Sequence, residues 1–335
     1  MAAETATVQL ELVGTPFVIA DEAPYCSFTD IAALKDGRLA VVYYAGKSHV
    51  DDSAEIHTRL SSDHGKTWSK PSALRVPENG SHPRDPHLTV LRNGTLLLSY
   101  FIYKGKTPDA CRSQVVASTD GGKTWSNPAQ VDVEGSLWNA TSGKIFEADE
   151  KTLHMPLYLC RKGETNEESG VISSSDGGRT WKNYVTIAKC PAAGMDAPFN
   201  EAEFARLKDR SIVALIRAEG QPGGALAISK DNGKTWQAPE KSPVGHAPGL
   251  LVDGDWLLVN YRNLKVGTTG LAISLDGGRS FAHSLTLSGS VTSWGDCAYG
   301  GIVKLPVGAP AAYLTTFYTQ HKGKVATMGC YFNVR

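Results

Sequence analysis

The chain has 335 residues, of which 41% are hydrophobic and 20% are charged, so it can fill a large core and is not a disordered protein. Lys and Arg (34) balance Asp and Glu (34), which argues against a general electrostatic grip on nucleic acid or an anionic membrane surface. No apolar run approaches the ~20 residues of a transmembrane helix. We expect no nucleic-acid partner and no membrane insertion.

The first residues, MAAETATVQL, lack the basic and apolar regions of a signal peptide. The compartment therefore stays open: the protein is cytoplasmic, or it is secreted or periplasmic if the mature protein begins here. The first expected strand follows at once, in the apolar-rich run TVQLELVGTPFVIA.

A second pattern then recurs along the chain: an apolar run, a polar turn and another apolar run. Asp-Gly or Asn-Gly occupies several of the turns, which is typical of β-hairpins. The expected hairpins cover residues 31–44, 87–101, 143–159, 204–217, 249–262 and 302–318. A further strand is expected in VATMGCYFNVR at the C-terminal end.

An octet of the form S-x-D-x-G-x-[TS]-[WF] follows the first five hairpins, each time after one more strand-like run. It occurs at residues 61–68, 118–125, 174–181, 229–236 and 274–281. In a tight turn an aspartate accepts hydrogen bonds from backbone N–H groups ahead of it, and glycine permits positive φ. The terminal Trp or Phe can anchor the turn by packing. We therefore expect structural roles for the five octet aspartates, Asp63, Asp120, Asp176, Asp231 and Asp276.

Three strands, the octet turn and a fourth strand make one propeller blade. The chain is predicted to form an all-β, six-bladed propeller of four-stranded antiparallel blades, as a single domain over residues 1–335. The sixth unit has lost its octet and is one strand short. The N-terminal run can supply that strand and close the ring, which protects the sheet edges.

The six cysteines contain no CxxC pair, so a zinc ribbon or a thioredoxin motif is not expected. In a chain of this length we expect buried thiols, although the even count permits disulfides. No HExxH or comparable ligand spacing indicates a metal site, and no cofactor is expected. The sequence does not give the oligomeric state.

The innermost strand of each blade faces the propeller axis, so residues in and just before these strands are candidates for a site. They are rich in charged, imidazole and aromatic groups, which suits a carbohydrate ligand. The candidates for substrate binding here are His82, Arg84, Asp85, Trp138, His246 and Asp296. Arg84 and Asp85 are adjacent, so in a regular strand they would point to opposite faces.

The octets resemble the Asp boxes, or BNR repeats, of the sialidase superfamily, and the resemblance covers essentially the whole chain. NEAEFARLKDRSIVALIR is similar to the sialidase strand pair that carries a glutamate and an arginine, which implies these places for Glu201 and Arg217. AYGGIVKL resembles the strand of the nucleophile, which implies Tyr299, with Gly300 where serine is common. Arg262 lies near the expected place of another carboxylate-binding arginine.

The same resemblance implies an acid/base aspartate in the loop after the first hairpin, where AGKSHVDDSAEIH offers Asp51 and Asp52 without deciding between them. One departure stands out. Ser27 occupies the place of the first-blade arginine of sialidases, and TTFYTQH lacks the glutamate that supports it. Arg84 at the second-blade rim suggests a rebuilt acid-binding site, or a substrate other than sialic acid.

Three functions remain open on this evidence. The first is a retaining, sialidase-like exo-glycoside hydrolase for a terminal acidic sugar, with Tyr299 as nucleophile. The second is a polysaccharide lyase or a histidine-dependent glycosidase on glycans containing uronic acid or rhamnose, with His82 or His246 as base. The third is a glycan-binding propeller without turnover. Each residue also has a structural alternative: Tyr299 as a packed channel tyrosine, Arg217 as a structural ion-pair partner, and the histidines as partners of loop carbonyls.

Overall fold

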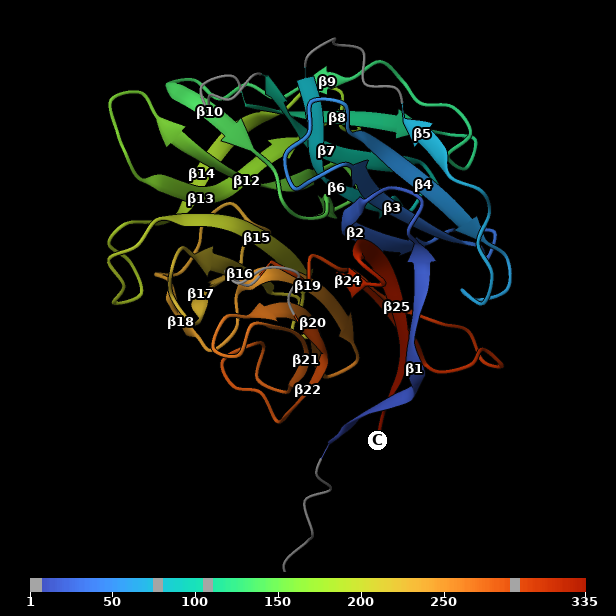
Figure 1. The fold of residues 1–335 in the computed structure, drawn as a ribbon. Helices are drawn as coiled ribbons and strands as arrows, with labels where there is room; N and C mark the ends of the chain where they lie inside the picture. Colours follow the sequence, from blue (N-terminus) through green and yellow to red (C-terminus); the bar gives the residue numbers. More distant parts are fainter. Residues whose placement is uncertain (1–7, 75–80, 105–110, 290–295) are drawn as a thin grey trace, which may run out of the picture.

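The computed structural model describes residues 8–74, 81–104, 111–289 and 296–335. The chain forms an all-β propeller, in which successive sheets follow one another around a common centre in chain order (Figure 1). Within these residues no helix is long and apolar enough to cross a membrane.

Four sheets stand separately, and each is built from consecutive antiparallel strands. The first contains β6 (Ser81–Val90), β7 (Leu96–Lys104), β8 (Arg112–Ser118) and β9 (Ala129–Gln130). The second contains β10 (Ser136–Ala140), β11 (Phe146–Glu147), β12 (Leu153–Arg161), β13 (Glu167–Ser174) and β14 (Lys182–Lys189). The third contains β15 (Phe199–Arg206), β16 (Ile212–Ala218), β17 (Gly224–Ser229) and β18 (Glu240–Ser242). The fourth contains β19 (His246–Asp253), β20 (Trp256–Asn263), β21 (Thr268–Ser274) and β22 (His283–Gly289).

The two ends of the chain share a fifth, eight-stranded mixed sheet. One half contains β23 (Ile302–Lys304), β24 (Tyr313–His321), β25 (Lys324–Val334) and β1 (Leu10–Ala20), and the other contains β2 (Tyr25–Ala33), β3 (Leu39–Gly46), β4 (Glu55–Ser61) and β5 (Ser72–Leu74). In the described strands, the ladder joins the halves at one parallel pair, Tyr25–Val325. The six separate blades expected from the sequence therefore appear as four separate sheets and this joined pair.

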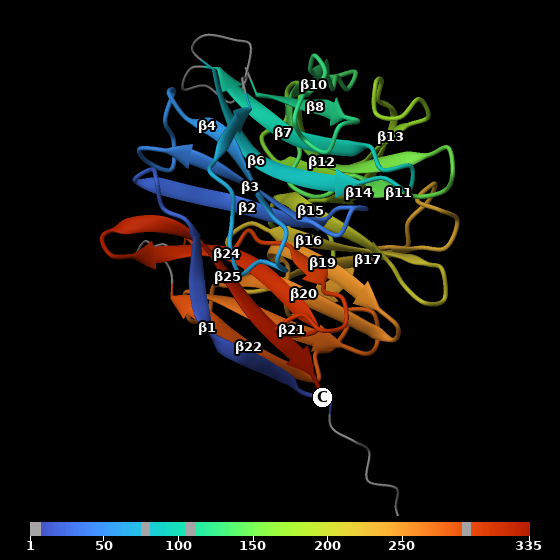
Figure 2. The same cartoon turned by 90° about the vertical axis from the view of Figure 1, so that its right-hand side faces the viewer.

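The predicted pairing of the N-terminal run is confirmed. β1 lies antiparallel to β25 from Leu10–Val334 to Ala20–Thr327, and Figure 2 shows the two strands side by side. The first and last strands of the chain are thereby each other's partners. The arrangement removes a free edge that would otherwise be open to another chain.

The octets form the turns that their residues predict. In the first, Asp63 accepts hydrogen bonds from the backbone N–H of Thr67 (2.9 Å) and from the Thr67 hydroxyl (2.6 Å). The Ser61 hydroxyl donates to Asp63 and accepts from the N–H of Gly65, whose φ is +90°. The same bonds recur in the other four octets. Each octet aspartate therefore accepts hydrogen bonds within its own turn.

The hydrophobic core is divided into clusters that lie between neighbouring sheets. One cluster joins β2 and β3 to β6–β8 through residues such as Val42 and Leu98. Another joins β1–β3 to β23 and β24 and so closes the ring. The octet aromatics pack onto these clusters, and Trp181 is buried among them. All six cysteines lie within the described residues as free thiols, five of them buried, which confirms the expectation of buried thiols over disulfides.

The inner strands share an irregularity that matters for the site. Strand pairing shifts register between Ser27 and Asp30 in β2, between Arg84 and His87 in β6, and at the matching places in β15 and β19. Phe28 and Asp85 at these bulges have positive φ (45° and 47°), and so does Tyr299 before β23 (45°). A bulge re-aims side chains, and bulges concentrate next to active sites.

Candidate active site

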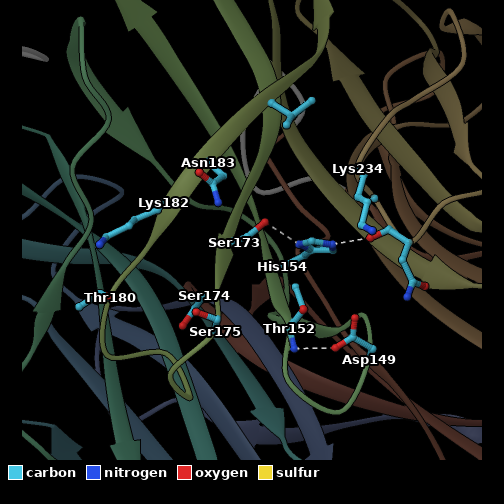
Figure 3. A pocket seen from close by; sticks show the side chains of 13 residues that line it. Asp149, Thr152, His154, Ser173, Ser174, Ser175, Thr180, Lys182, Asn183 and Lys234 are labelled. Atoms are coloured by element: carbon cyan, nitrogen blue, oxygen red, sulfur yellow. Dashed lines mark hydrogen bonds between the residues drawn. The ribbon is translucent and has the colours of Figure 1, made fainter.

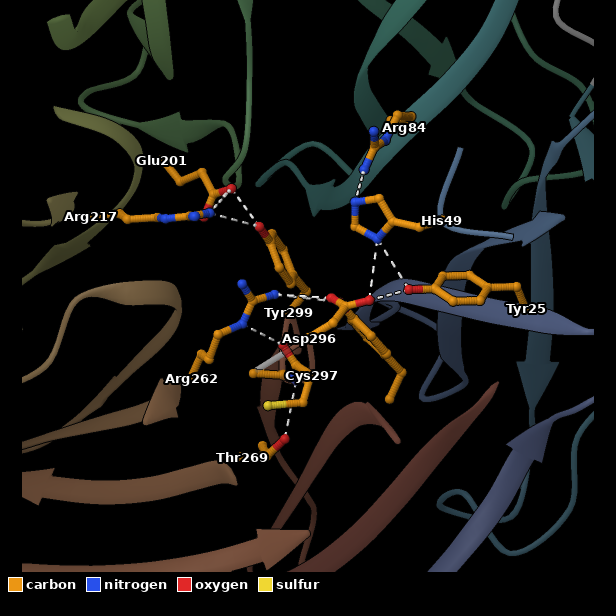
Figure 4. A network of polar contacts seen from close by, with 12 residues as sticks. Tyr25, His49, Arg84, Glu201, Arg217, Arg262, Thr269, Asp296, Cys297 and Tyr299 are labelled. Atoms are coloured by element: carbon orange, nitrogen blue, oxygen red, sulfur yellow. Dashed lines mark hydrogen bonds and ion pairs between the residues drawn. The ribbon is translucent and has the colours of Figure 1, made fainter. Parts of the chain in front are cut away.

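Tyr299 is the centre of a compact polar group drawn in Figure 4. Its hydroxyl donates a hydrogen bond to Oε1 of Glu201 on β15 (2.5 Å). Nη1 of Arg217 on β16 donates to the same carboxylate oxygen (2.8 Å) and to the Tyr299 hydroxyl (3.2 Å). The three residues predicted separately from sequence are therefore in direct contact, although Glu201 and Tyr299 lie 98 positions apart.

The surroundings of this group shift the pKa values of Tyr299 and Glu201 in opposite directions. Burial and the Glu201 carboxylate raise the pKa of Tyr299 well above its usual value. Burial also opposes ionisation of Glu201, but the charges of Arg217 and Arg262 hold its pKa below the usual value. The resting state is a protonated phenol facing an ionised carboxylate. A phenol in this state becomes a nucleophile when the carboxylate takes its proton.

Two further arginines approach the Tyr299 ring. The guanidinium of Arg262 on β20 lies 4.9 Å from the ring centroid. Arg84 on β6 is placed over the ring of Phe28 (4.9 Å), and that ring in turn lies 5.2 Å from Tyr299 in an edge contact. Together with Arg217 they bring positive charge to one small volume, which suits a carboxylate ligand.

Asp296 lies behind the arginines and is fully buried. One of its oxygens accepts hydrogen bonds from Tyr318 and from Nη2 of Arg262 (3.2 Å). The other accepts from Tyr25 and lies 3.2 Å from Nδ1 of His49. Because protein donors occupy both oxygens, the geometry favours a supporting place for Asp296 over the direct substrate contact expected from sequence.

Asp85 does not lie in the regular strand on which the expectation of opposite faces for Arg84 and Asp85 depends. The bulge and the positive φ of Asp85 break the strand alternation. Asp85 is 4% exposed, and burial raises its pKa to about 7, although Arg84 favours its ionised form. Its Oδ1 is buried and finds no hydrogen-bond partner among the described residues.

The two candidate acid/base aspartates differ in their surroundings. The Asp51 carboxylate accepts hydrogen bonds from the N–H of Lys47 (2.7 Å) and from the N–H and hydroxyl of Ser53 (2.9 and 2.8 Å), so it shapes its own loop. The Asp52 side chain is 64% exposed, and its Oδ1 lies 3.1 Å from Nδ1 of His82. Geometry therefore favours Asp52, whose carboxylate is exposed and reaches His82.

The remaining candidates surround this centre. His82 is fully buried and stacks on Tyr103, with ring centroids 5.5 Å apart. His246 lies 2.6 Å through Nε2 from the carbonyl of Gln221, the loop-carbonyl contact that the structural alternative describes. Trp138 packs edge-on against Tyr158 within a cluster beside β7 and β8.

Several buried polar atoms around the Tyr299 group lack hydrogen-bond partners among the described residues. They are Nε of Arg84, Oδ1 of Asp85, Oε2 of Glu201, Nε of Arg217 and Nδ1 of His246. Buried polar atoms are nearly always paired, so an unpaired group at one place points to a polar ligand or ordered water there. No group of three or more His, Cys, Asp or Glu side chains in the described part of the chain could hold a metal ion.

Comparison with known proteins now adds to the geometry. A family model described as BNR repeat-like domain matches residues 37–308. The chain belongs to this BNR repeat-like family.

A sialidase from Bacteroides fragilis is 26% identical over 324 residues, covering 81% of this chain and 57% of that protein. The BNR chain thus spans just over half of that relative. A Dyadobacter fermentans protein of unknown function matches in structure with a TM-score of 0.84 and 22% identity, over 97% of this chain and 99% of that one. The Hadza microbial sialidase Hz136 matches with a TM-score of 0.74 and 17% identity, over 94% and 68% of the two chains. These structural matches show a shared fold.

Two departures of this BNR chain from the sialidase pattern gain physical explanations. A Cβ at Gly300 would lie 1.6 Å from the carbonyl oxygen of Thr316, so the serine common at this place does not fit. Ser27 is fully buried. The ring of its neighbour Phe28 contacts Tyr299 and lies under the guanidinium of Arg84.

Sequence reasoning missed three members of the centre: Phe28, His49 and Tyr318. His49 shares a loop with Asp51 and Asp52, and that proximity was the only signal for it. Phe28 and Tyr318 read as ordinary strand residues, and only the closure of the ring brings them to Tyr299.

A separate pocket of about 420 Å³ lies between β12–β14 and the octet loop after β17 (Figure 3). His154 lies in it, 2.9 Å through Nδ1 from the Ser173 hydroxyl and 2.7 Å through Nε2 from the carbonyl of Asn232. The predicted site residues do not line this pocket. Its histidine links two neighbouring sheets and has both ring nitrogens engaged, which is a structural role.

Proposed function

We propose that this protein is a sialidase-like exo-glycoside hydrolase that removes a terminal acidic sugar from glycans by a retaining mechanism. The proposed scaffold is one domain and a six-bladed propeller, in which the halves of the mixed sheet count as two blades. The observation that carries the proposal is the contact of the Tyr299 hydroxyl with Glu201, bridged by Arg217. The sialidase relatives support the reaction class.

In the first step the Tyr299 oxygen attacks the anomeric carbon and its proton passes to Glu201. The bond to the leaving oxygen breaks, and that oxygen takes a proton from Asp52. In the second step Asp52 removes a proton from water, the water oxygen attacks the anomeric carbon, and Tyr299 leaves with the proton returned by Glu201. Each step uses one acid and one base.

Arg84, Arg217 and Arg262 are the proposed ligands of the sugar carboxylate. Arginine binds carboxylates through paired N–H donors, and its charge is retained at every relevant pH. Nε of Arg84 and of Arg217 is buried without a hydrogen-bond partner in the described residues, and a bound acid group would supply one.

The test is Tyr299→Phe, assayed by release of methylumbelliferone from the α-glycoside of N-acetylneuraminic acid. Loss of the nucleophile is expected to lower kcat at least about 10³-fold. Tyr184→Phe is the matched control, because it removes a buried tyrosine hydroxyl from β14, outside the Tyr299 group. Equal turnover of Tyr299→Phe and wild type would overturn the proposed nucleophile.

The state of His246 supports the second candidate function, an elimination reaction on a uronate. Burial and the charge of Arg217 lower the pKa of His246 to about 4, so its imidazole is neutral, and its Nδ1 has no partner within the described residues. A neutral imidazole beside an arginine could remove the C5 proton of a uronate. Elimination yields an unsaturated sugar that absorbs in the ultraviolet, so uronate oligosaccharides should be assayed for both products. Binding without either product would indicate a glycan-binding propeller.

A further inference from the structure

We propose that His49 and Asp296 act as a positioning pair that orients Arg84 and Arg262 together beside Tyr299. The inference rests on the proposed function and extends it, because it names the residues that compensate for the arginine missing from β2. Neither residue is proposed to touch the substrate.

The contacts of His49 define which ring nitrogen carries its proton. Nη2 of Arg84 lies 2.7 Å from Nε2 of His49, and arginine has only donors. Nε2 must therefore accept, and the proton sits on Nδ1. Nδ1 in turn lies 3.1 Å from the Tyr25 hydroxyl oxygen and 3.2 Å from Oδ2 of Asp296. The imidazole thus receives a hydrogen bond from the arginine and donates one to the carboxylate group behind it.

Asp296 fixes the far end of this series of hydrogen bonds. It accepts hydrogen bonds from Tyr25 and Tyr318 and forms a salt bridge with Arg262 (3.2 Å). Arg262 also donates from Nε to the carbonyl of Cys297 (3.1 Å). One buried carboxylate therefore holds Arg262 directly and Arg84 through His49.

These contacts also explain how Arg84, a residue of β6, comes to lie beside β2. The Arg84 guanidinium lies over Phe28, the residue next to Ser27, at 4.9 Å from the ring centroid. His49 packs edge-on against the same ring, at 5.1 Å between centroids. The contact with Phe28 fixes the distance of the guanidinium from that ring, and the hydrogen bond to His49 fixes the orientation of the guanidinium plane. Figure 4 shows Arg84, His49 and Asp296 in a continuous line.

The first experiment reads the proton position without an assay of activity. Long-range ¹H–¹⁵N spectra of the full chain labelled in histidine nitrogen report whether Nδ1 or Nε2 is protonated. Wild type is expected to show the His49 proton on Nδ1 and not on Nε2. Arg84→Met and Asp296→Ala should each shift that signal. A protonated Nε2 in wild type, or a His49 signal unchanged in both variants, would overturn the proposal.

The second experiment compares His49→Leu with His49→Gln, because the glutamine amide oxygen can accept from Arg84 at the place of Nε2. His49→Leu is expected to raise KM at least about 10-fold with kcat changed less than about 3-fold, since it removes uniform binding. His49→Gln should restore most of the loss. His64→Asn is the control, because the equivalent octet position already carries Asn232.

An unchanged KM in His49→Leu, or a His49→Gln variant no better than His49→Leu, would refute the positioning role. Absence of hydrolysis in wild type would refute the proposed function alone. The proton position of His49 would still decide the inference in that case.

Discussion

The Tyr299 phenol and the Glu201 carboxylate show at residue scale how environment assigns chemistry. Both side chains are buried, yet the pKa of one is raised and that of the other is lowered. The adjacent arginines favour the ionised form of both groups, but the negative charge of Glu201 opposes ionisation of the phenol. Strongly perturbed pKa values of this kind cluster at functional sites.

The choice between the two loop aspartates is testable at this scale. Asp52→Asn is expected to lower kcat about 10²-fold or more on sialyllactose, whose leaving group needs a proton. The loss should be much smaller on the methylumbelliferyl glycoside, which leaves without strong acid assistance. Asp51→Asn should stay within about 3-fold on both substrates, because the Asp51 carboxylate accepts hydrogen bonds from Lys47 and Ser53 of its own loop. The reverse ranking would assign the acid role to Asp51.

At the scale of elements, the octet turn fastens each sheet to its predecessor. The glycine of the fourth octet, Gly233, has a φ of +82°, and a Cβ there would lie 2.6 Å from Nε2 of His154 in the preceding sheet. The turn is thus both a local hydrogen-bond motif and a contact between sheets.

Gly233→Ala should therefore destabilise the protein by about 2–4 kcal/mol, from the left-handed φ and from displacement of His154. Gly220→Ala is the matched control, because its φ is +69° but nothing lies within 4 Å of the added Cβ. It should cost only about 1–2 kcal/mol. Midpoints of urea unfolding measure both, and equal losses would show that the contact with His154 contributes nothing.

The inner-strand bulges are the second feature at this scale. They recur at matching places in β2, β6, β15 and β19, where they interrupt the alternation of side chains. A propeller blade without them would present alternate residues to the axis. With them, adjacent residues such as Arg84 and Asp85 no longer follow the regular alternation.

At the scale of the whole molecule, a buried charged group links four sheets near the axis. Asp30 of β2 accepts a hydrogen bond from the N–H of Leu88 on β6 (2.9 Å) and pairs with Nζ of Lys144 (3.1 Å). The N–H of Lys144 donates to Oε2 of Glu203 on β15 (2.9 Å). These bonds tie the four sheets together.

Glu203 makes the stability of the assembly depend on pH. Burial raises its pKa to about 8 from an ordinary 4.5, although Lys144 opposes the shift. The folded state keeps the proton that the unfolded chain loses above pH 4.5. Its contribution to stability is therefore complete below that pH and is lost as pH rises through about 8.

Glu203→Gln should remove this term while the amide oxygen still accepts from Lys144. The free energy of unfolding of wild type is expected to fall between pH 5 and 8.5 by on the order of 1–3 kcal/mol more than that of the variant. Every other group titrates in both proteins, so the difference in slope isolates Glu203. Parallel pH profiles would contradict a buried, protonated Glu203.

The propeller repeat, the octet turns and the pairing of the chain ends could be predicted from the residues of the sequence alone. Turns and hairpins depend on residues a few positions apart, so local sequence patterns predict them. The resemblance to sialidases supplied the longer-range match between β15, β16 and the strand of Tyr299.

The surroundings of Glu201, Arg217 and Tyr299 became apparent only in the tertiary structure. The positive φ of Phe28 and Asp85 reverses the alternation that a sequence pattern assumes. The bond between His49 and Asp296 joins residues 247 positions apart, and it forms because the two ends of the chain share one sheet. Contacts of this kind follow from ring closure and from bulge geometry, and neither leaves a periodic signal in the sequence.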